Sequence, residues 1–144
     1  MFGAEYRDCC PRDHEPLIVM ERDGIELEHC PECRGTWFDE GELEIIAERA
    51  GASVPLVAAL ESATPARRTS DPCPRCGRKL ETITVACQPE AVEIERCPSG
   101  DGFWLAHGDL RALLAGLAEG EGRPIGELLG GMFRYEIKSR KEGG

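Results

Sequence analysis

Four Cys-Pro turns are spread along the 144-residue chain, and they carry its most specific chemistry. The turns begin at Cys10, Cys30, Cys73 and Cys97, and Cys33 and Cys76 complete CxxC pairs with two of them. Two thiolates at this spacing can both point into one cavity when the turn is tight, and two such turns joined by a hairpin enclose a tetrahedral zinc ion. Proline after the first cysteine and glycine after the second suit such a turn. The spacing therefore predicts zinc binding.

The residues around the cysteines occur twice. HCPECRGTWFDEGEL at residues 29–43 returns as RCPSGDGFWLAHGDL at residues 96–110. The Cys30 and Cys97 turns match at an offset of 67 residues, and the turns before them match at an offset of 63, so four extra residues lie in a loop of the second copy. The repeat predicts two units of about 70 residues. Units of this size bury little apolar surface, so they commonly need a structural metal.

Each unit is expected to contain a hairpin followed by a helix. Alternating apolar and polar residues predict half-buried strands, and apolar residues three and four apart predict a helix. The predicted strands are LIVM (17–20), IELEH (25–29), LETITV (80–85) and AVEIER (91–96), and the predicted helices are GELEIIAERA (41–50) and LRALLAGLA (110–118). Asp39 and Glu42 predict a reciprocal N-cap for the first helix. Ala106 occupies the capping position of the second helix, which is therefore expected to begin less firmly.

The most specific motif lies in residues 10–46, CPRDHEPLIVMERDGIELEHCPECRGTWFDEGELEII. It resembles the bacterial transcription-factor-IIB-type zinc-ribbon family, whose pattern is CPxC, a hairpin, and then CPxCxGxWxDxGEL. Residues 73–114 are similar but more divergent. The resemblance implies two tandem zinc ribbons with two zinc ions per chain. It implies no particular activity, because the family has no common established one.

The expected fold is a small, metal-stabilised α+β protein with two tandem zinc ribbons, each a β-hairpin with two cysteine turns and a following helix. The predicted organisation is a first zinc ribbon with its helix at 1–52, a short helix and linker at 53–70, a second zinc ribbon with its helix at 71–120, and a C-terminal helix and tail at 121–144. The linker is predicted from its small, polar and proline-containing sequence.

Both copies depart from the family pattern at one ligand position. Asp13 stands where a second cysteine belongs, with His14 after it, and Gly100 stands where a fourth belongs, with Asp101 after it. A replacement ligand one residue later gives predicted sites of Cys10, His14, Cys30 and Cys33 in the first copy and Cys73, Cys76, Cys97 and Asp101 in the second. The open alternatives are Asp13 or Cys9 in the first site, and Cys87, His107 or a water molecule in place of Asp101.

Trp37 and Trp104 occupy equivalent positions between a metal turn and a helix. Exposed aromatic side chains can stack on nucleic-acid bases. A small ribbon, however, needs one large side chain to cover its hairpin, so packing is the favoured interpretation. Catalysis is not expected, because no Cys-His-Asp arrangement with an accompanying general base is evident from the spacing.

The net charge of −10 disfavours nucleic acid as a partner, because affinity for phosphates comes from lysine and arginine. Residues 1–70 carry 7 Lys+Arg against 15 Asp+Glu, and residues 71–144 carry 10 against 12. Any phosphate contact is therefore expected in the second half, through Arg75, Arg78, Lys79, Arg96, Lys138, Arg140 and Lys141. A protein partner is favoured, with apolar anchors among Leu113, Leu114, Leu128, Leu129, Met132 and Phe133.

The expected location is the cytoplasm, because MFGAEYRDCC does not resemble a secretory signal and no stretch approaches membrane-spanning length. The predicted function is that of a non-enzymatic zinc-binding protein, a protein-interaction or regulatory adaptor. The alternative is a transcription-related zinc finger that binds nucleic acid through its less acidic second half.

Overall fold

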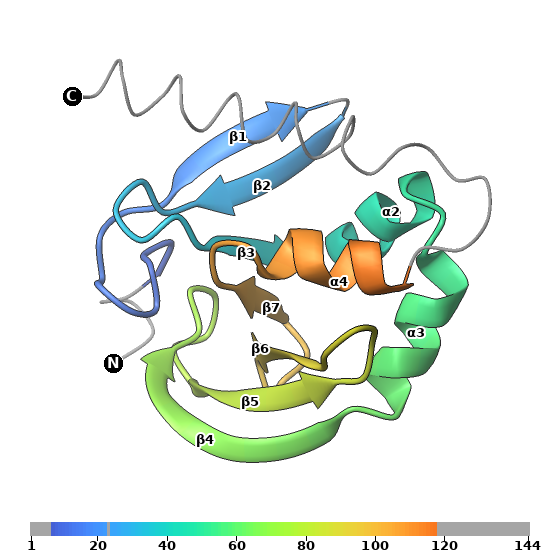
Figure 1. Cartoon of the computed structure of the whole chain (residues 1–144). Helices are drawn as coiled ribbons and strands as arrows, with labels where there is room; N and C mark the ends of the chain where they lie inside the picture. Colours follow the sequence, from blue (N-terminus) through green and yellow to red (C-terminus); the bar gives the residue numbers. More distant parts are fainter. Residues whose placement is uncertain (1–6, 23, 118–144) are drawn as a thin grey trace.

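The computed structural model of the chain describes residues 7–22 and 24–117. Their strands form one antiparallel sheet in the order β1-β2-β3-β7-β6-β5-β4. The strands are β1 (Ile18–Arg22), β2 (Ile25–His29), β3 (Thr36–Asp39), β4 (Thr64–Pro72), β5 (Lys79–Val85), β6 (Val92–Arg96) and β7 (Gly102–Leu105), and the helices are α2 (Glu42–Arg49), α3 (Ser53–Glu61) and α4 (Asp109–Leu117). Figure 1 shows β1 at one end of the sheet and β4 at the other, with the labelled helices grouped together.

The two repeats meet along the central pair of strands. β3 of the first repeat pairs with β7 of the second, and Trp37 lies directly opposite Trp104. These tryptophans are equivalent at the 67-residue offset, and one step along the pair Phe38 faces Phe103. An approximate twofold axis therefore passes between the two tryptophans. The described parts of both repeats form one continuous sheet.

The two faces of the sheet carry different cores, because successive strand residues point to opposite faces. Phe38, Leu105 and Ile94 belong to the larger core, which includes apolar residues of α2, α3 and α4. Trp37 and Trp104 belong to a second cluster that contains cysteines of both repeats. Both indoles are buried, which confirms their expected packing role.

The predicted hairpins and their following helices are present. β1 with β2 and β5 with β6 form the two hairpins, and each predicted strand agrees with the observed one to within two residues. α2 and α4 begin and end within one residue of their predicted bounds. In α2 the apolar residues Leu43, Ile46 and Ala47 are buried, as their helical spacing predicted.

The start of α2 differs from the expected reciprocal cap. Oε1 of Glu42 accepts the backbone N–H of Asp39 at 2.9 Å, as expected. The Asp39 carboxylate does not cap the helix, because its Oδ1 accepts the indole N–H of Trp37 and the Nε–H of Arg75, each at 2.8 Å. At α4, Oδ2 of Asp109 likewise accepts the backbone N–H at position 106, at 3.0 Å. The two helix starts are therefore held by equivalent hydrogen bonds. The Asp39 side chain binds Trp37 and Arg75 instead of capping the helix.

The segment predicted as a short helix and linker is more regular than its composition suggested. α3 covers its first part, and β4 then pairs with β5 at the edge of the sheet. The residues of β4 are mostly exposed, and edge strands commonly carry polar residues and proline. The helix expected near the C-terminus, in residues 121–144, lies outside the described residues. Each of the helices described above is too short or too polar to cross a membrane.

Candidate metal centres

Four side chains meet where the first two cysteine turns lie together: Cys10, Asp13, Cys30 and Cys33. Sγ of Cys10 lies 3.7 Å from Sγ of Cys33, and Sγ of Cys30 lies 3.4 Å from Oδ2 of Asp13. One ligand atom from each residue lies within 4.8 Å of the other three. Two members, Cys10 and Cys30, are buried, and the other two are exposed. The first centre therefore lies at the surface, anchored in the tryptophan cluster.

The second centre gathers Cys73, Cys76, Cys97 and Asp101. Sγ of Cys76 lies 3.6 Å from Sγ of Cys97. Oδ2 of Asp101 lies 3.5 Å from Sγ of Cys97 and 3.7 Å from Sγ of Cys73. Both centres therefore offer three thiols and one carboxylate.

These separations fit a tetrahedral zinc ion. Zinc binds sulfur at about 2.3 Å and carboxylate oxygen at about 2.0 Å, so neighbouring sulfurs lie about 3.8 Å apart and sulfur and oxygen about 3.5 Å apart. The thiol pairs of the two centres lie 3.7 and 3.6 Å apart, and the sulfur–oxygen distances lie between 3.4 and 3.7 Å. A disulfide would need about 2.05 Å. The donor set and its spacing are those of a metal centre.

Backbone hydrogen bonds give the four cysteine turns a common shape. In each turn the N–H of the leading cysteine donates to the carbonyl oxygen five residues later, at 2.7–3.0 Å. A backbone N–H two or three residues later donates to the cysteine sulfur at 3.3–3.4 Å. Such bonds favour the ionised thiolate, which is the form that binds metal. The turns therefore hold the leading thiols in position.

His14 does not join the first centre, which differs from the sequence prediction. Its backbone has φ 65° and donates its N–H to the carbonyl of Cys10 at 2.9 Å. Gly77 occupies the equivalent place in the second repeat and has φ 78°. In both turns, the residue directly after the last donor therefore adopts the left-handed backbone conformation. Asp13 stands at the position equivalent to Cys76, and it supplies the fourth donor in place of His14.

Asp101 lies in the second centre, at the position named from the sequence. Gly100 has φ 86°, and its N–H donates to the carbonyl of Cys97 at 3.0 Å. In the first repeat the left-handed residue of the matching turn is Arg34, which follows Cys33. In the second repeat the left-handed residue, Gly100, comes one position earlier than Arg34 does in the first. The fourth donor, Asp101, comes one position later than Cys33 does.

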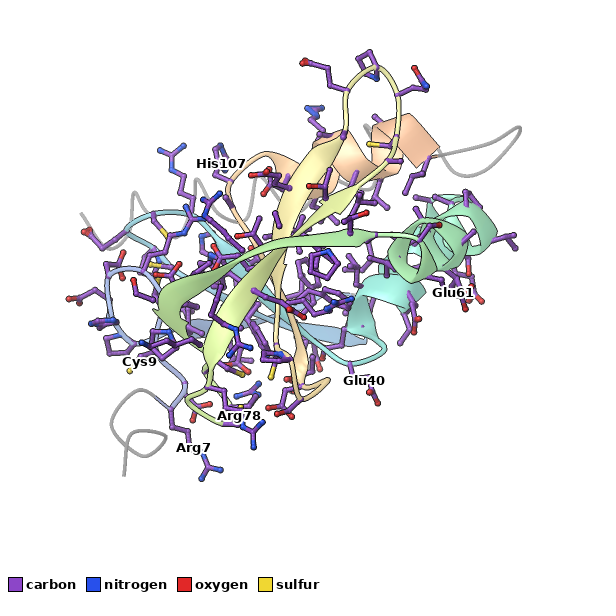
Figure 2. The ribbon with its side chains drawn as sticks, turned by 90° about the horizontal axis from the view of Figure 1, so that it is seen from below. Arg7, Cys9, Glu40, Glu61, Arg78 and His107 are labelled. Carbon is purple, nitrogen blue, oxygen red and sulfur yellow. The ribbon has the colours of Figure 1, made fainter. Side chains whose placement is uncertain are left out.

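The other candidate ligands lie elsewhere. Cys87 donates its S–H to the carbonyl of Glu90 in the β5–β6 loop, at 3.3 Å. Figure 2 shows His107 well separated from Arg78, the residue that closes the first turn of the second centre. Cys9 also stands outside both groups of donors. Cys9, Cys87 and His107 are therefore not among the donors of either centre.

Burial disfavours ionisation of four of the cysteine ligands. It raises the pKa of Cys10 and of Cys73 far above the ordinary range of a thiol, and it raises the pKa of Cys30 and Cys76 as well. Burial acts in the same sense on Asp13, but hydrogen bonds from the backbone and from thiols outweigh it and lower the pKa of that carboxyl. A divalent cation stabilises thiolates in such surroundings, so metal binding and proton release are coupled.

The two centres coincide with the segments that match a known family. The family model described as transcription factor zinc-finger, a TFIIB-type zinc ribbon, matches residues 9–49 and 72–116, which together exceed half of the chain. The chain belongs to this zinc-ribbon family. Each matched segment contains one centre, so the protein has two zinc ribbons with one candidate zinc site in each. No curated protein and no solved structure matches the chain.

Ion pairs that were not predicted from the sequence join the two zinc ribbons. Arg75 lies in the first turn of the second ribbon, and it contacts three carboxylates of the first. These belong to Asp8, Glu28 and Asp39, and the last accepts hydrogen bonds from Nε and Nη2, each at 2.8 Å. Opposite Glu28 across the strand pair lies Trp37. The guanidinium therefore covers the tryptophan face of the sheet.

Arg12 makes the equivalent contacts from the first ribbon to the second. Its Nη2 donates to Oε2 of Glu95 at 2.9 Å, and its Nε lies 4.0 Å from Oδ2 of Asp71. Both carboxylates are the repeat equivalents of partners of the other arginine. The third partner is missing, because Ala106 stands at the position of Asp39. The only sequence signal for these contacts was the Cys-Pro-Arg tripeptide common to both repeats.

Proposed function

We propose that this zinc-ribbon protein is a non-catalytic adaptor in which two structural zinc ions hold one sheet that is presented to a protein partner. The main observation behind this proposal is that each centre contains four possible protein ligands. Catalytic zinc sites keep a position for water or substrate, whereas structural sites are filled by protein ligands. Two complete donor sets therefore support a structural role for the metal.

The use of arginine in this fold supports a protein partner over nucleic acid. Arg75 is held by three carboxylates of the first ribbon, and Arg96 donates to Glu81 at 2.9 Å. Both arginines were candidates for phosphate contacts. To bind a phosphate, each would have to leave its carboxylates, on a chain whose net charge is −10. Arg78 and Lys79 are the exposed candidates that remain within the described second ribbon.

The apolar anchors expected from the sequence require a correction. Leu113 and Leu114 have no exposed surface and belong to the core under α4, so neither can contact a partner. Their burial follows from their spacing on a helix whose apolar side packs against β6. Leu128, Leu129, Met132 and Phe133, the other expected anchors, lie outside the described residues.

Metal content and coordination test the structural part of the proposal. Native mass spectrometry of the purified full chain should find two zinc ions. X-ray absorption at the zinc edge should give three sulfur ligands and one oxygen or nitrogen ligand per ion. One zinc ion per chain, or a first shell with an exchangeable water as fourth ligand, would contradict two closed structural sites.

Nucleic-acid binding tests the choice of partner. Fluorescence anisotropy with labelled DNA and RNA at physiological salt is expected to show no saturable binding by the zinc-loaded chain. The Arg78→Gln/Lys79→Gln variant is the matched control, because it removes exposed charge without touching either centre. If the wild type bound nucleic acid with micromolar affinity and this variant did not, nucleic-acid binding would replace protein binding as the favoured function.

A further inference from the structure

A pocket of about 500 Å³ opens beside Trp104 on the tryptophan face of the second ribbon. Two buried polar atoms of its wall have no hydrogen-bond partner among the described residues, Nε1 of Trp104 and Oε1 of Glu95. Both side chains are more than nine-tenths buried. Leaving a buried polar group unpaired is energetically unfavourable. An acceptor group in the pocket would therefore satisfy the indole N–H of Trp104, whereas Oε1 of Glu95 is itself an acceptor and would need a donor.

The first ribbon shows what kind of group fits there. At the equivalent place, the carboxylate of Asp39 accepts the indole N–H of Trp37 at 2.8 Å and two hydrogen bonds from Arg75. Trp104 is the repeat equivalent of Trp37, and Ala106 replaces the aspartate. The second ribbon thus keeps the tryptophan and the arginine of this arrangement but lacks the carboxylate.

We propose that the pocket binds a carboxylate from outside the chain, which takes the position that the Asp39 side chain takes in the first ribbon. It would accept the indole N–H of Trp104 and a hydrogen bond from Arg12. A small organic acid and an acidic side chain of a bound peptide share this chemistry. The inference does not depend on the adaptor role or on the partner class proposed above.

The charges around the two positions favour this occupant. Four carboxylates of the second ribbon line the pocket, those of Asp71, Glu93, Glu95 and Asp109, and their repeat equivalents in the first ribbon are Asp8, Glu26, Glu28 and Glu42. The first ribbon tolerates a fifth carboxylate with Arg75 as the bridging cation. In the second ribbon Arg12 is joined by Arg67 and Arg68 of β4, which also line the pocket. Counting these described residues alone, the second position therefore has two more positive charges and one fewer negative charge.

The two tryptophans provide a direct test. The zinc-loaded, ¹⁵N-labelled full chain contains two indole N–H groups, one in each ribbon. Titration with acetate, in exchange for chloride at constant ionic strength, is expected to shift the Trp104 indole resonance saturably and to leave the Trp37 resonance in place. Acetate has four non-hydrogen atoms, so saturation is expected at roughly millimolar to tens of millimolar concentration.

Two substitutions should reverse which ribbon has an internal carboxylate and which ribbon responds to acetate. Ala106→Asp supplies an internal carboxylate, so the acetate-dependent shift of the Trp104 resonance should disappear. Asp39→Ala removes the internal carboxylate of the first ribbon, so the Trp37 resonance should become sensitive to acetate. Should either variant fail to fold, Arg67→Gln/Arg68→Gln leaves both tryptophans, Asp39 and Ala106 in place, and it is expected to weaken acetate binding at least threefold because it removes two positive charges from the pocket wall.

A second ligand separates the two sources of the carboxylate. Acetyl-aspartate methylamide presents the same group on a peptide backbone. Binding at least tenfold tighter than acetate assigns the pocket to an acidic peptide side chain, and any weaker binding than that assigns it to small organic acids. A Trp104 resonance that does not respond to either ligand, or that responds equally in Ala106→Asp, would overturn the proposal.

Discussion

Arg75 and Asp39 form a two-point ion pair across the boundary between the repeats, with Nε to Oδ1 and Nη2 to Oδ2 both at 2.8 Å. The same Oδ1 accepts the indole N–H of Trp37. One carboxylate therefore connects the cysteine turn of the second ribbon to the central strand pair of the first. Stability of either ribbon should depend on residues of the other.

Asp39→Ala is expected to destabilise the zinc-loaded protein by about 1–2 kcal/mol, because it removes charge-assisted hydrogen bonds at a partly exposed position. Thermal unfolding measures the change. Glu40→Ala is the matched control, since Glu40 is an exposed acidic neighbour on the same turn. Equal melting temperatures for the two variants would contradict the role given to the Asp39 side chain.

Ala106→Asp is expected to stabilise the protein by about 0.5–1.5 kcal/mol, the net value of a hydrogen bond to the unpaired Trp104 indole. The backbone supports this, since the N–H at position 106 is held by Asp109 as that of Asp39 is held by Glu42. Denaturant unfolding of the zinc-loaded chain measures it. Ala106→Leu adds bulk without an acceptor, and an equal gain from leucine would show that filling space is the cause.

Zinc affinity measurements should show whether Asp13 or its neighbour His14 is the fourth ligand of the first centre. Asp13→Ala is expected to weaken zinc binding at the first centre at least about tenfold, because loss of a direct ligand should cost no less than loss of an outer hydrogen-bond partner. His14→Ala should change the affinity much less. Chelator competition followed by native mass spectrometry gives both values. Greater loss with His14→Ala would restore the histidine as the ligand.

Gly35→Ala should be destabilising because a methyl group there would overlap the indole ring of Trp104. Overpacking of this kind costs about 1–3 kcal/mol. A double-mutant cycle isolates the contact: in a Trp104→Val background the same substitution should cost at least about 1 kcal/mol less. Equal costs in both backgrounds would mean that Gly35 is required for another reason.

Removal of metal should be visible in the tryptophans. Trp37 and Trp104 pack in one cluster with Cys10, Cys30, Cys73 and Cys97. Chelation is therefore expected to abolish the near-ultraviolet circular dichroism of both indoles in step with zinc release, and zinc should restore it. A chelated protein that keeps this signal would show that the sheet folds without metal.

The hairpins, the helices after them and most of the metal ligands could be predicted, because each leaves a local pattern. IELEH alternates with the period of a strand, and Cys-Pro pairs recur at ligand spacing. In the first centre the structure groups Asp13 with the three thiols, one residue before the predicted His14. Both side chains can bind zinc, and the left-handed backbone of His14, with φ 65°, could not be predicted from the residue type.

The joining of the repeats could not be predicted. β3 and β7 have four residues each, too few to show a clear alternation of apolar and polar residues, and their pairing joins residues 63 to 69 positions apart. β4 was missed for a different reason, since an edge strand with polar residues on both faces has the composition of a linker. The ion pairs of Arg12 and Arg75 depend on this pairing, so they too became visible only in three dimensions.

The symmetric strand pair has a consequence for the history of the chain. A strand that pairs with its own equivalent residue makes an isologous contact, the kind that joins two identical subunits in a homodimer. A protein of one such repeat could form the same sheet from two copies, but each substitution would then occur on both sides. Because both copies lie in a single chain, one side can keep Asp39 while the other carries Ala106. Fusion of the copies thus allows one half to hold its own carboxylate and the other to leave that position open.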